Sequence, residues 1–340
     1  MNRKIAHKIS CIACLIFVFV SSCSKTDEAA YNKMFYLQSK GAQMPIWVRG
    51  NLASNVLILH LHGGPGEGSL YESYSPFWQK LETAYGVVYW DQRGSGSSNG
   101  NVDSSTITYA QFGQDCHDVI RLLKKEFPDK EIFLLGHSFG VELGWQFLTT
   151  DDWQNEVKGF MLVDGTYSAW AYFKHQYDYV QEQAVLQNRN DIYSWTLDHP
   201  LTPENVYDAS FNEDQLFAYQ EILSQDKTIY HFGIASRFLG PYDHWRYITG
   251  SNLYRAPLPI FYEGHRFDFS PKLPNVTIPV QILWGRKDGN EPLQIGIDTD
   301  SLLVNSPHEM IVFDSSWHSP MHSETDKFYD AVHGFVEMWK

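Results

Sequence analysis

The chain has 340 residues, of which 43% are hydrophobic and 15% aromatic, and its formal net charge is −14 at pH 7. This amount of apolar sequence is enough for one large core, or for one core with an inserted subdomain. The negative charge argues against a nucleic-acid partner, because the phosphates would be repelled.

The N-terminal segment predicts export. Three basic residues precede an apolar run over Ile9–Val20, which is too short to span a bilayer comfortably and is typical of a signal peptide. The run ends in the sequence VSSC, which resembles the lipobox of a bacterial lipoprotein; a plain secretory signal with an incidental cysteine is the alternative. We expect residues 1–22 to be removed and residues 23–33 to form a flexible tether. A lipid on Cys23 would anchor the protein to a membrane facing the periplasm or the cell surface.

The remaining cysteines and the histidines do not predict a disulfide or a metal site. Cys11 and Cys14 lie in the segment that is removed, so with Cys23 acylated only Cys116 is left. Outside the signal segment the sequence has no H-E-x-x-H or C-x-x-C motif. We therefore expect no metal and no other cofactor.

The first apolar segments after the tether predict an edge strand pair and a central strand of a sheet. Met34–Leu37 and Pro45–Arg49 are expected to form an antiparallel pair of strands. Val56–His62 is almost entirely apolar, as is typical of a parallel strand that is covered on both faces. It runs into the glycine-rich loop HGGPG, whose backbone N–H groups can approach a ligand closely.

A helix over Pro76–Thr83 and a strand over Val87–Trp90 come next. The strand ends in DQRGSGS, in which we expect Asp91 and Arg93 to form a buried pair that braces the loops around a site. Thr108–Phe127 has the pattern of an amphipathic helix, which Pro128 ends.

The segment EIFLLGHSFGVELGWQFLTT (131–150) predicts a strand, a G-x-S-x-G turn and a helix. A serine on such a strained turn needs glycine on both sides, and the helix directs its free N–H groups toward the group that the serine attacks. Ser138 is therefore the candidate nucleophile. Gly96–Gly100 also matches G-x-S-x-G, but no helix directly follows it, so we reject Ser98.

The alternation of strands and helices is interrupted after the strand Gly159–Val163. Residues 166–274 are rich in aromatic and acidic side chains and have helical stretches, such as Tyr172–Gln187 and Glu213–Ser224, but no strand–helix–strand pattern. The alternation resumes with the strand Val280–Trp284. We predict an α/β fold with a mostly parallel central sheet, whose core comprises residues 34–165 and 275–340 and whose inserted helical cap (lid) comprises residues 166–274.

Acyl transfer by a serine also needs a base, an acid that orients the base, and two donors for the oxyanion. Asp288 follows the strand Val280–Trp284, and His318 follows the last predicted strand, Met310–Phe313. Asp164 and His322 are the alternatives to these two residues. We prefer Asp288 because it comes after the insertion, and His318 because it follows its strand more closely. The N–H of Phe139 and that of Gly64, with Gly63 as its alternative, are the candidate oxyanion donors.

The motifs HGGPG, DQRGSGS, GHSFG, GRKD and HSP, in this order, resemble those of α/β-hydrolases of the prolyl iminopeptidase branch. The resemblance covers Val56–Lys340 apart from the cap. It implies a Ser138–His318–Asp288 triad and a serine peptidase that releases an N-terminal residue, often proline, through an acyl-enzyme. The elbow of that branch is often GGSWG or GGSYG, whereas many esterases and lipases share GHSFG.

A free α-amine requires carboxylates where it binds, and the aromatic cap would hold a proline ring. We expect a cap carboxylate, with Glu204 or Glu263 among the candidates, although most of these acids are expected to face water. The alternative is a carboxylesterase or lipase-like enzyme acting on small acyl esters. A third hypothesis is a non-catalytic, lipid-anchored binding protein on a hydrolase scaffold, which a complete triad argues against. The sequence leaves the oligomeric state open.

Overall fold

The computed structural model describes residues 31–207, 212–228 and 267–340. The predicted signal peptide and Cys23 lie outside these residues, as do most of the predicted tether and Glu263. In the described part of the chain, no helix is both long enough and apolar enough to cross a membrane.

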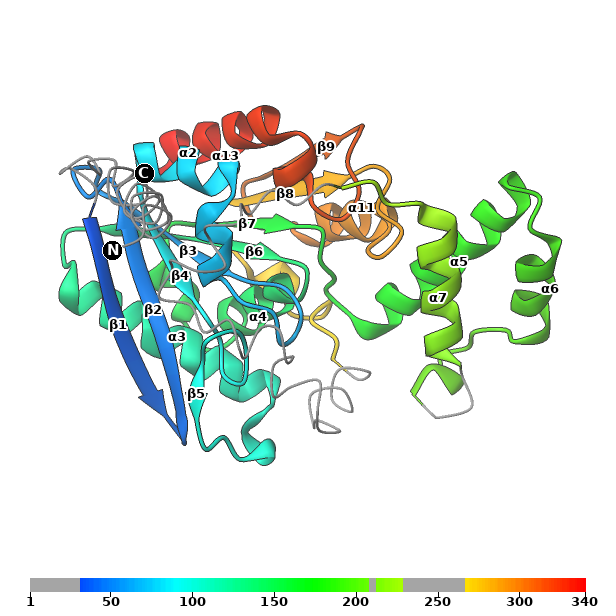
Figure 1. Ribbon diagram of the computed structural model, residues 1–340, viewed down its shortest axis with the longest axis horizontal. Coiled ribbons are helices and arrows are strands. Elements are labelled where there is room, and N and C mark those ends of the chain that lie inside the picture. Colours follow the sequence, from blue (N-terminus) through cyan, green and yellow to red (C-terminus); the bar gives the residue numbers. More distant parts are fainter. Residues whose placement is uncertain (1–30, 208–211, 229–266) are drawn as a thin grey trace, which may run out of the picture.

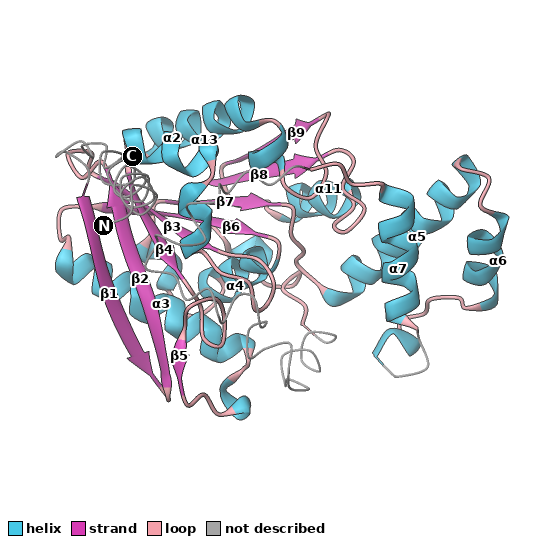
Figure 2. Cartoon of the chain, in the orientation of Figure 1, coloured by secondary structure: helices cyan, strands magenta, loops and turns pink. Residues whose placement is uncertain are grey.

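The described strands form one sheet, in the order β1-β2-β4-β3-β6-β7-β8-β9, with β5 paired to β2 (Figures 1 and 2). The strands β1 and β2 are antiparallel to each other, and β2 is antiparallel to β4. From β4 to β9 all neighbours run parallel. The strands are β1 (Tyr31–Ser39), β2 (Ala42–Gly50), β3 (Val56–Leu61), β4 (Gly86–Trp90), β5 (Asn99–Gly100), β6 (Glu131–His137), β7 (Gly159–Val163), β8 (Val280–Gly285) and β9 (His308–Phe313).

Helices cover both faces of the sheet, so that its central strands contribute to two apolar layers (Figure 1). Along β3, Leu57 and Leu59 pack into one layer, whereas Ile58 packs into the other, as the alternation of strand side chains requires. Helices α3, α4 and α11 belong to the first layer and α2, α12 and α13 to the second. The helices are α2 (Pro76–Ala84), α3 (Tyr109–Glu126), α4 (Phe139–Leu148), α5 (Ala169–Leu186), α6 (Asn190–Asp198), α7 (Glu213–Ser224), α11 (Leu293–Leu302), α12 (Pro320–Ser323) and α13 (Thr325–Trp339).

This architecture confirms the predicted fold class, an α/β-hydrolase fold with a mostly parallel central sheet. The strands β3, β6, β7 and β8, of which only the end residues of β6 are not buried, are parallel neighbours, and their carboxyl ends lie along one edge of the sheet. Ligand sites in parallel sheets form at this edge, because the loops that follow the strands meet there.

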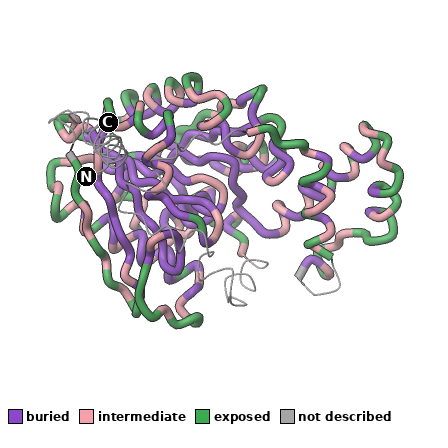
Figure 3. The backbone as a smooth tube through the Cα atoms, in the orientation of Figure 1, coloured by how far each residue is buried: buried purple, intermediate pink, exposed green. Residues whose placement is uncertain are grey.

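The helices α5, α6 and α7 extend from one side of the molecule, between β7 and β8 in the chain (Figure 1). They have an apolar cluster of their own, in which Val180 of α5 packs with Ile192 of α6 and Leu216 of α7. Their outer surface is largely exposed or half-buried, in contrast to the buried sheet (Figure 3). The helical character of this segment agrees with the sequence pattern, while its division into a separate cap at residues 166–274 stays a prediction.

The chain leaves and re-enters the sheet layer through a short two-stranded contact. The N–H of Ala169 donates to the carbonyl of Phe267 (3.0 Å), and the N–H of Phe269 donates to the carbonyl of Tyr167 (2.9 Å). Ser168 and Asp268 form an antiparallel bridge between them. The two ends of the segment that carries α5–α7 are thereby held side by side, next to the carboxyl end of β7.

Candidate active site

Ser138 lies on a strained turn between β6 and α4. Its backbone has φ 52° and ψ −124°, a conformation that a residue with a Cβ rarely adopts. The N–H of Ser138 donates to the carbonyl of Val163 in β7 (2.9 Å), and the N–H of Val141 donates to the carbonyl of Ser138 (2.8 Å). These contacts fix the turn of a nucleophile elbow, in which the serine hydroxyl is presented at the carboxyl edge of the sheet.

The glycines of the motif are required by close approach of the backbone. A Cβ at Gly140 would lie 1.9 Å from the carbonyl oxygen of Leu61, and one at Gly136 would lie 2.7 Å from the carbonyl oxygen of Gly140. Any larger residue at either position would displace β3 or the first turn of α4. Both glycines of the G-x-S-x-G pattern are therefore required because the neighbouring backbone leaves no room for a side chain.

Asp288 and His318 form a hydrogen-bonded pair. Nδ1 of His318 lies 2.7 Å from Oδ2 of Asp288, whose side chain is almost fully buried. The other oxygen of Asp288 accepts the N–H groups of Asn290 (2.8 Å) and Glu291 (3.0 Å). This arrangement fixes the carboxylate and selects the imidazole tautomer that carries its proton on Nδ1.

The pKa of His318 is raised above its ordinary value by the charges around it. Burial acts in the opposite direction, but the attraction of Asp288 and its hydrogen bond outweigh this effect, with smaller contributions from Glu67 and Asp226. The imidazolium that forms when His318 takes up a proton is thus stabilised within the site.

Asp164 and His322, the alternatives to Asp288 and His318, have other partners. Oδ1 of Asp164 accepts the N–H of Gly285 at 2.7 Å, and burial, followed by repulsion from Asp288, raises the pKa of Asp164. Nε2 of His322 lies 3.5 Å from a carboxylate oxygen of Glu72. The structure therefore brings Asp288 and His318 together and leaves Asp164 and His322 out of the pair.

Nε2 of His318 faces the side chain of Asn290, with 3.2 Å between Nε2 and Nδ2. Because Nδ1 donates to Asp288, Nε2 is the acceptor of this bond. Asn290 Oδ1 in turn accepts the hydroxyl of Tyr172 at 3.3 Å. No hydrogen bond joins Ser138 to His318, both of which lie in the described part of the chain, and Nε2 of His318 is bound by the amide of Asn290 instead. The sequence pattern did not indicate this contact of Asn290.

His137, the residue before Ser138, also supports the histidine. Its Nε2 donates to the carbonyl oxygen of His318 (2.7 Å), and the two rings are 4.9 Å apart between centroids. Burial, followed by repulsion from His318, lowers the pKa of His137 to about 3, so this ring is neutral at pH 7. It fixes the backbone of His318 next to the nucleophile elbow.

The predicted oxyanion loop lies beside the elbow. Gly64 lines the same pocket as Ser138 and Phe139. A Cβ at Gly63 would lie 3.3 Å from the Cβ of Ser138. The structure thus brings all three predicted donor residues next to Ser138, and which N–H groups bind an oxyanion stays a prediction.

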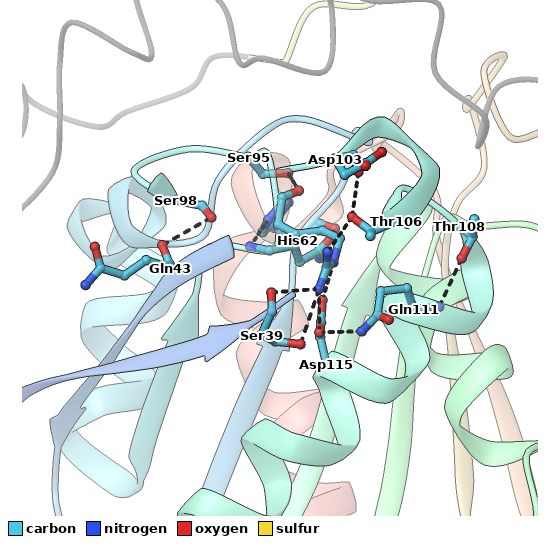
Figure 4. Close-up of polar contacts among 12 residues, drawn as sticks. Ser39, Gln43, His62, Ser95, Ser98, Asp103, Thr106, Thr108, Gln111 and Asp115 are labelled. Carbon is cyan, nitrogen blue, oxygen red and sulfur yellow. Dashed lines mark hydrogen bonds and ion pairs between the residues drawn. The ribbon is translucent and has the colours of Figure 1, made fainter. Parts of the chain in front are cut away.

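His62 holds this loop against the loop that follows β4 (Figure 4). Its Nδ1 donates to the carbonyl of Gly63 (2.7 Å), and its Nε2 accepts the N–H of Gln92 (3.1 Å). The side chain of Gln92 donates back to the carbonyl of His62 (3.1 Å). Burial lowers the pKa of His62 to about 4, so the neutral ring keeps this pattern across the physiological range.

The predicted ion pair between Asp91 and Arg93 is wrong, because each residue has another partner. The buried Arg93 binds Asp115 of α3 through two contacts (2.5 and 2.8 Å) and Thr106 through a third (2.8 Å) (Figure 4). Oδ1 of Asp91 accepts the N–H of Ser69 at 2.6 Å, and its Oδ2 accepts that of Ser97, also at 2.6 Å. Both residues still brace the loops near the site, but Asp91 does so through backbone groups.

Next to Ser138 lies a pocket of about 180 Å³ that contains two buried carboxyl groups. Glu142, in the first turn of α4, accepts the hydroxyl of Tyr109 at 2.5 Å. One carboxyl oxygen of Glu291 is buried without a hydrogen-bond partner among the described residues. Aromatic side chains form much of the remaining wall: Tyr109, Phe139, Tyr172, Phe173 and Phe267.

Both carboxyl groups have raised pKa values. Burial raises the pKa of Glu142 to about 8, although the hydrogen bond from Tyr109 acts in the opposite direction. Burial also raises the pKa of Glu291, with further contributions from Glu142 and Asp288. A positively charged group bound in this pocket would stabilise the ionised carboxylates and lower both pKa values.

Glu142 belongs to α4 and Glu291 to the loop that follows β8, whereas the sequence led us to expect a cap carboxylate. Of the cap candidates, Glu204 is exposed and does not line this pocket, and Glu263 lies outside the described residues. No spacing rule pointed to Glu142 or Glu291. The only signal was their position, four residues after the candidate nucleophile and three after the candidate acid.

Within the described residues, no group of three or more His, Cys, Asp or Glu side chains is arranged to hold a metal ion. Cys116 is buried in the layer that contains α3 and α4, and its thiol is free.

Comparisons with known proteins agree with this geometry. Residues 56–325 match the family model described as alpha/beta hydrolase fold. The chain is 22% identical over 287 residues to a proline iminopeptidase of Saccharolobus solfataricus, which covers 84% of this chain and 86% of that protein. It is 37% identical over 105 residues to a probable aminopeptidase of Bacillus subtilis, but this match covers only 30% of the chain and 32% of the relative.

Solved structures show the same fold. A proline iminopeptidase-related protein from Thermus thermophilus superposes with a TM-score of 0.59 at 19% identity, over 91% of this chain and 98% of that one. An esterase from Exiguobacterium antarcticum superposes with a TM-score of 0.58 at 18% identity, over 90% of this chain and 100% of that one. At these identities the likeness concerns the fold alone.

Proposed function

Because the chain belongs to the α/β-hydrolase family, we propose that it is a serine hydrolase whose catalytic triad is Ser138, His318 and Asp288. The support is the strained elbow under Ser138 and the 2.7 Å contact between His318 and the buried Asp288. The tautomer that Asp288 selects leaves Nε2 of His318 as a base, which is what proton transfer from the serine needs.

The proposed reaction proceeds through an acyl-enzyme. His318 Nε2, once released by Asn290, takes the proton of the Ser138 hydroxyl while the serine oxygen attacks the substrate carbonyl. The N–H groups of Phe139 and Gly64 stabilise the negative oxygen that forms. The intermediate collapses when His318 returns the proton to the leaving nitrogen or oxygen. A water molecule then attacks the acyl-enzyme, with His318 as the base again, and releases the acid and the free serine.

We further propose that the substrate is a peptide with a free N-terminal amine, and that the enzyme releases a small N-terminal residue, with proline preferred. The observation that carries this proposal is the presence of Glu142 and Glu291 in the pocket that Ser138 lines. A bound ammonium would stabilise the ionised form of both carboxyl groups, whose ionisation is costly in a buried site without an opposite charge.

The size and walls of the pocket also suit this substrate. A volume of about 180 Å³ with aromatic walls is small for a ligand site and matches one compact residue rather than a long acyl chain. Two of the relatives carry names that refer to aminopeptidase or proline iminopeptidase activity, which agrees with the same assignment.

A carboxylesterase acting on small acyl esters is the second candidate. It is favoured by one specific observation, the raised pKa values of Glu142 and Glu291. Protonated carboxyl groups are neutral, so a pocket with both acids protonated would also accept an uncharged acyl group. The non-catalytic alternative would require that the elbow and the His318–Asp288 pair have no chemical use.

We also propose that the protein is exported and anchored to a membrane by a lipid on Cys23. The support is the sequence alone, in which a basic segment, a short apolar run and VSSC precede a polar stretch.

The test of the proposed activity is a panel of four substrates, hydrolysed by the protein that begins at Ser24. The panel consists of proline p-nitroanilide, alanine p-nitroanilide, N-acetyl-proline p-nitroanilide and p-nitrophenyl acetate. We expect cleavage of the unblocked amides, with proline preferred and the blocked amide resistant. Turnover of the acetate alone would assign the protein to the esterases, and no turnover together with no labelling of Ser138 by a fluorophosphonate would contradict a serine hydrolase.

A further inference from the structure

The pocket next to Ser138 that contains Glu142 and Glu291 is called the acyl pocket below, and a second pocket shares Asn290 with it. It has a volume of about 350 Å³ and is lined by His318, Asp288, Asn290 and Trp317 on the sheet side. The end of α7 and the segment after it form the opposite wall. In the proposed reaction His318 protonates the leaving nitrogen, so the leaving peptide has to lie within hydrogen-bond reach of this ring. The pocket is therefore the place for the leaving peptide.

A third pocket, of about 490 Å³, adjoins this one. The two share Ser224, Gln225 and Trp317. The indole N–H of Trp317 donates to the carbonyl of Ser224 (3.0 Å), so this side chain joins the end of α7 to the loop that carries His318. The two adjoining pockets, with Trp317 and Ser224 in the wall that they share, are called the groove below.

The far end of the groove is cationic. Lys227, Arg286 and Lys287 all line the third pocket. Arg286 is paired with Asp314 at 2.5 Å, whereas neither lysine has an ion-pair partner among the described residues. The ammonium of Lys287 lies 4.7 Å from the ring centroid of Trp317, which orients it along the shared wall.

The near end of the groove is acidic. Glu221, Asp226 and Asp288 line the pocket at His318. The acids near His318 repel a carboxylate, and the lysines at the far end attract it. This charge pattern favours one direction of a peptide along the groove, with its C-terminal carboxylate at the lysines. The cationic end is the place for a C-terminal carboxylate that lies more than one residue from the scissile bond.

We propose that the enzyme acts on short peptides with a free C-terminal carboxylate, and that Lys227 and Lys287 bind this carboxylate. The inference rests on the proposed peptidase function and adds the second end of its substrate. It predicts a preference for free acids over C-terminal amides in tripeptides and tetrapeptides. In dipeptides, whose carboxylate lies beside the acids near His318, the preference is smaller.

The test compares Pro-Ala-Ala with its C-terminal amide. For the wild-type protein at low salt we expect kcat/KM to favour the free acid about three- to tenfold, as partly exposed charge pairs do. The preference should fall as salt is added. The double variant Lys227→Met/Lys287→Met should lose it, and Lys272→Met, which changes an exposed lysine outside the groove, should keep it. Equal rates for acid and amide in the wild type, or a preference that survives in the double variant, would overturn the proposal.

Binding to the Ser138→Ala variant separates this inference from the proposed function. Calorimetric titration with the same two peptides measures the effect of the carboxylate on Kd without turnover. A weaker Kd for the amide, abolished by the two lysine substitutions, supports the carboxylate site even where proline p-nitroanilide is not cleaved. Equal Kd values contradict it even where proline p-nitroanilide is a good substrate.

Discussion

His318 is in contact with three residues that act on different parts of its ring and backbone. Asp288 binds Nδ1, Asn290 donates to Nε2, and His137 donates to the backbone carbonyl. The first contact raises the proton affinity of the ring, and the second covers Nε2, the base of the proposed reaction. In the proposed reaction, the serine hydroxyl takes the place at Nε2 that the neutral amide of Asn290 occupies in the structure.

The raised pKa of His318 predicts a specific pH dependence. A general base has to be neutral, so the rate is low below its pKa and rises above it. Because the pKa of His318 is raised, the ascending limb of kcat/KM should have its midpoint above the ordinary histidine value of about 6.5. Asp288→Asn removes the principal cause of the increase, so the midpoint should move to lower pH while the maximal rate falls about 10²- to 10⁴-fold.

His308→Gln is the control for this pH profile, since His308 pairs with Asp300 on the surface. It should leave both midpoint and rate unchanged. A midpoint that stays fixed in Asp288→Asn would show that another group titrates.

The sequence indicated Asp288 and His318 because each follows a strand that ends at the active edge of the sheet. It could not indicate Glu142, Glu291 or Asn290 as parts of the pocket, because their burial depends on how α4 and the loop after β8 pack together. Acids distributed along an acidic chain give no local signal of burial. The cap candidates, including Glu204, were chosen for their residue type alone.

At the scale of elements, the nucleophile elbow depends on the close packing of α4 against β3. The contact is backbone to backbone at Gly140, so no side-chain rotation can relieve it. The elbow is thus stabilised by the sheet, and the strain at Ser138 is maintained by packing on both sides.

Two glycine-to-alanine substitutions in helices should have opposite effects. Gly140→Ala sets a Cβ 1.9 Å from the carbonyl oxygen of Leu61 and should destabilise the protein by about 3 kcal/mol or more. Gly334→Ala, in the exposed part of α13, meets nothing within 4 Å and should stabilise it by about 0.5–1 kcal/mol. Urea denaturation followed by circular dichroism measures both, and a tolerated Gly140→Ala would contradict the packing described for the elbow.

Most elements could be predicted from periodicity. The predicted helix Glu213–Ser224 has the observed bounds of α7, and the apolar runs became the buried strands β3, β6, β7 and β8. The partner of Arg93 could not be predicted, because Asp115 is distant in sequence and reaches it only through the packing of α3. Closeness in sequence, as between Asp91 and Arg93, therefore does not predict which charged side chains form an ion pair.

On the scale of the whole molecule, the active edge of the sheet faces the segment that carries α5–α7. Tyr172 and Phe173 of α5 line the acyl pocket, and the end of α7 lines the groove next to His318. In the proposed reaction, substrate selection would therefore be shared between the sheet side, where α4 and the loops carry the acids and the proposed triad, and the helices α5–α7.

The proposed lipid anchor concerns the whole molecule as well. In a bacterial host the wild-type chain should incorporate labelled palmitate and sediment with membranes, and Cys23→Ala should abolish both. Cys14→Ala is the control, since Cys14 lies in the segment expected to be removed and the mature protein is unchanged. Palmitate found in Cys23→Ala would contradict the assignment.

The proposal that Glu142 and Glu291 recognise a free amine can be tested by one ratio. It is kcat/KM for proline p-nitroanilide divided by that for N-acetyl-proline p-nitroanilide, measured in the wild type and in Glu142→Gln/Glu291→Gln. We expect the wild type to favour the free amine strongly, and the double variant to reduce the ratio about 10- to 100-fold, because buried charge-assisted contacts are lost. Glu204→Gln, which changes an exposed acid outside the pocket, should leave the ratio as it is. A wild type that cleaves both substrates equally well, or a ratio that the double variant does not change, would contradict an amine site at these two residues.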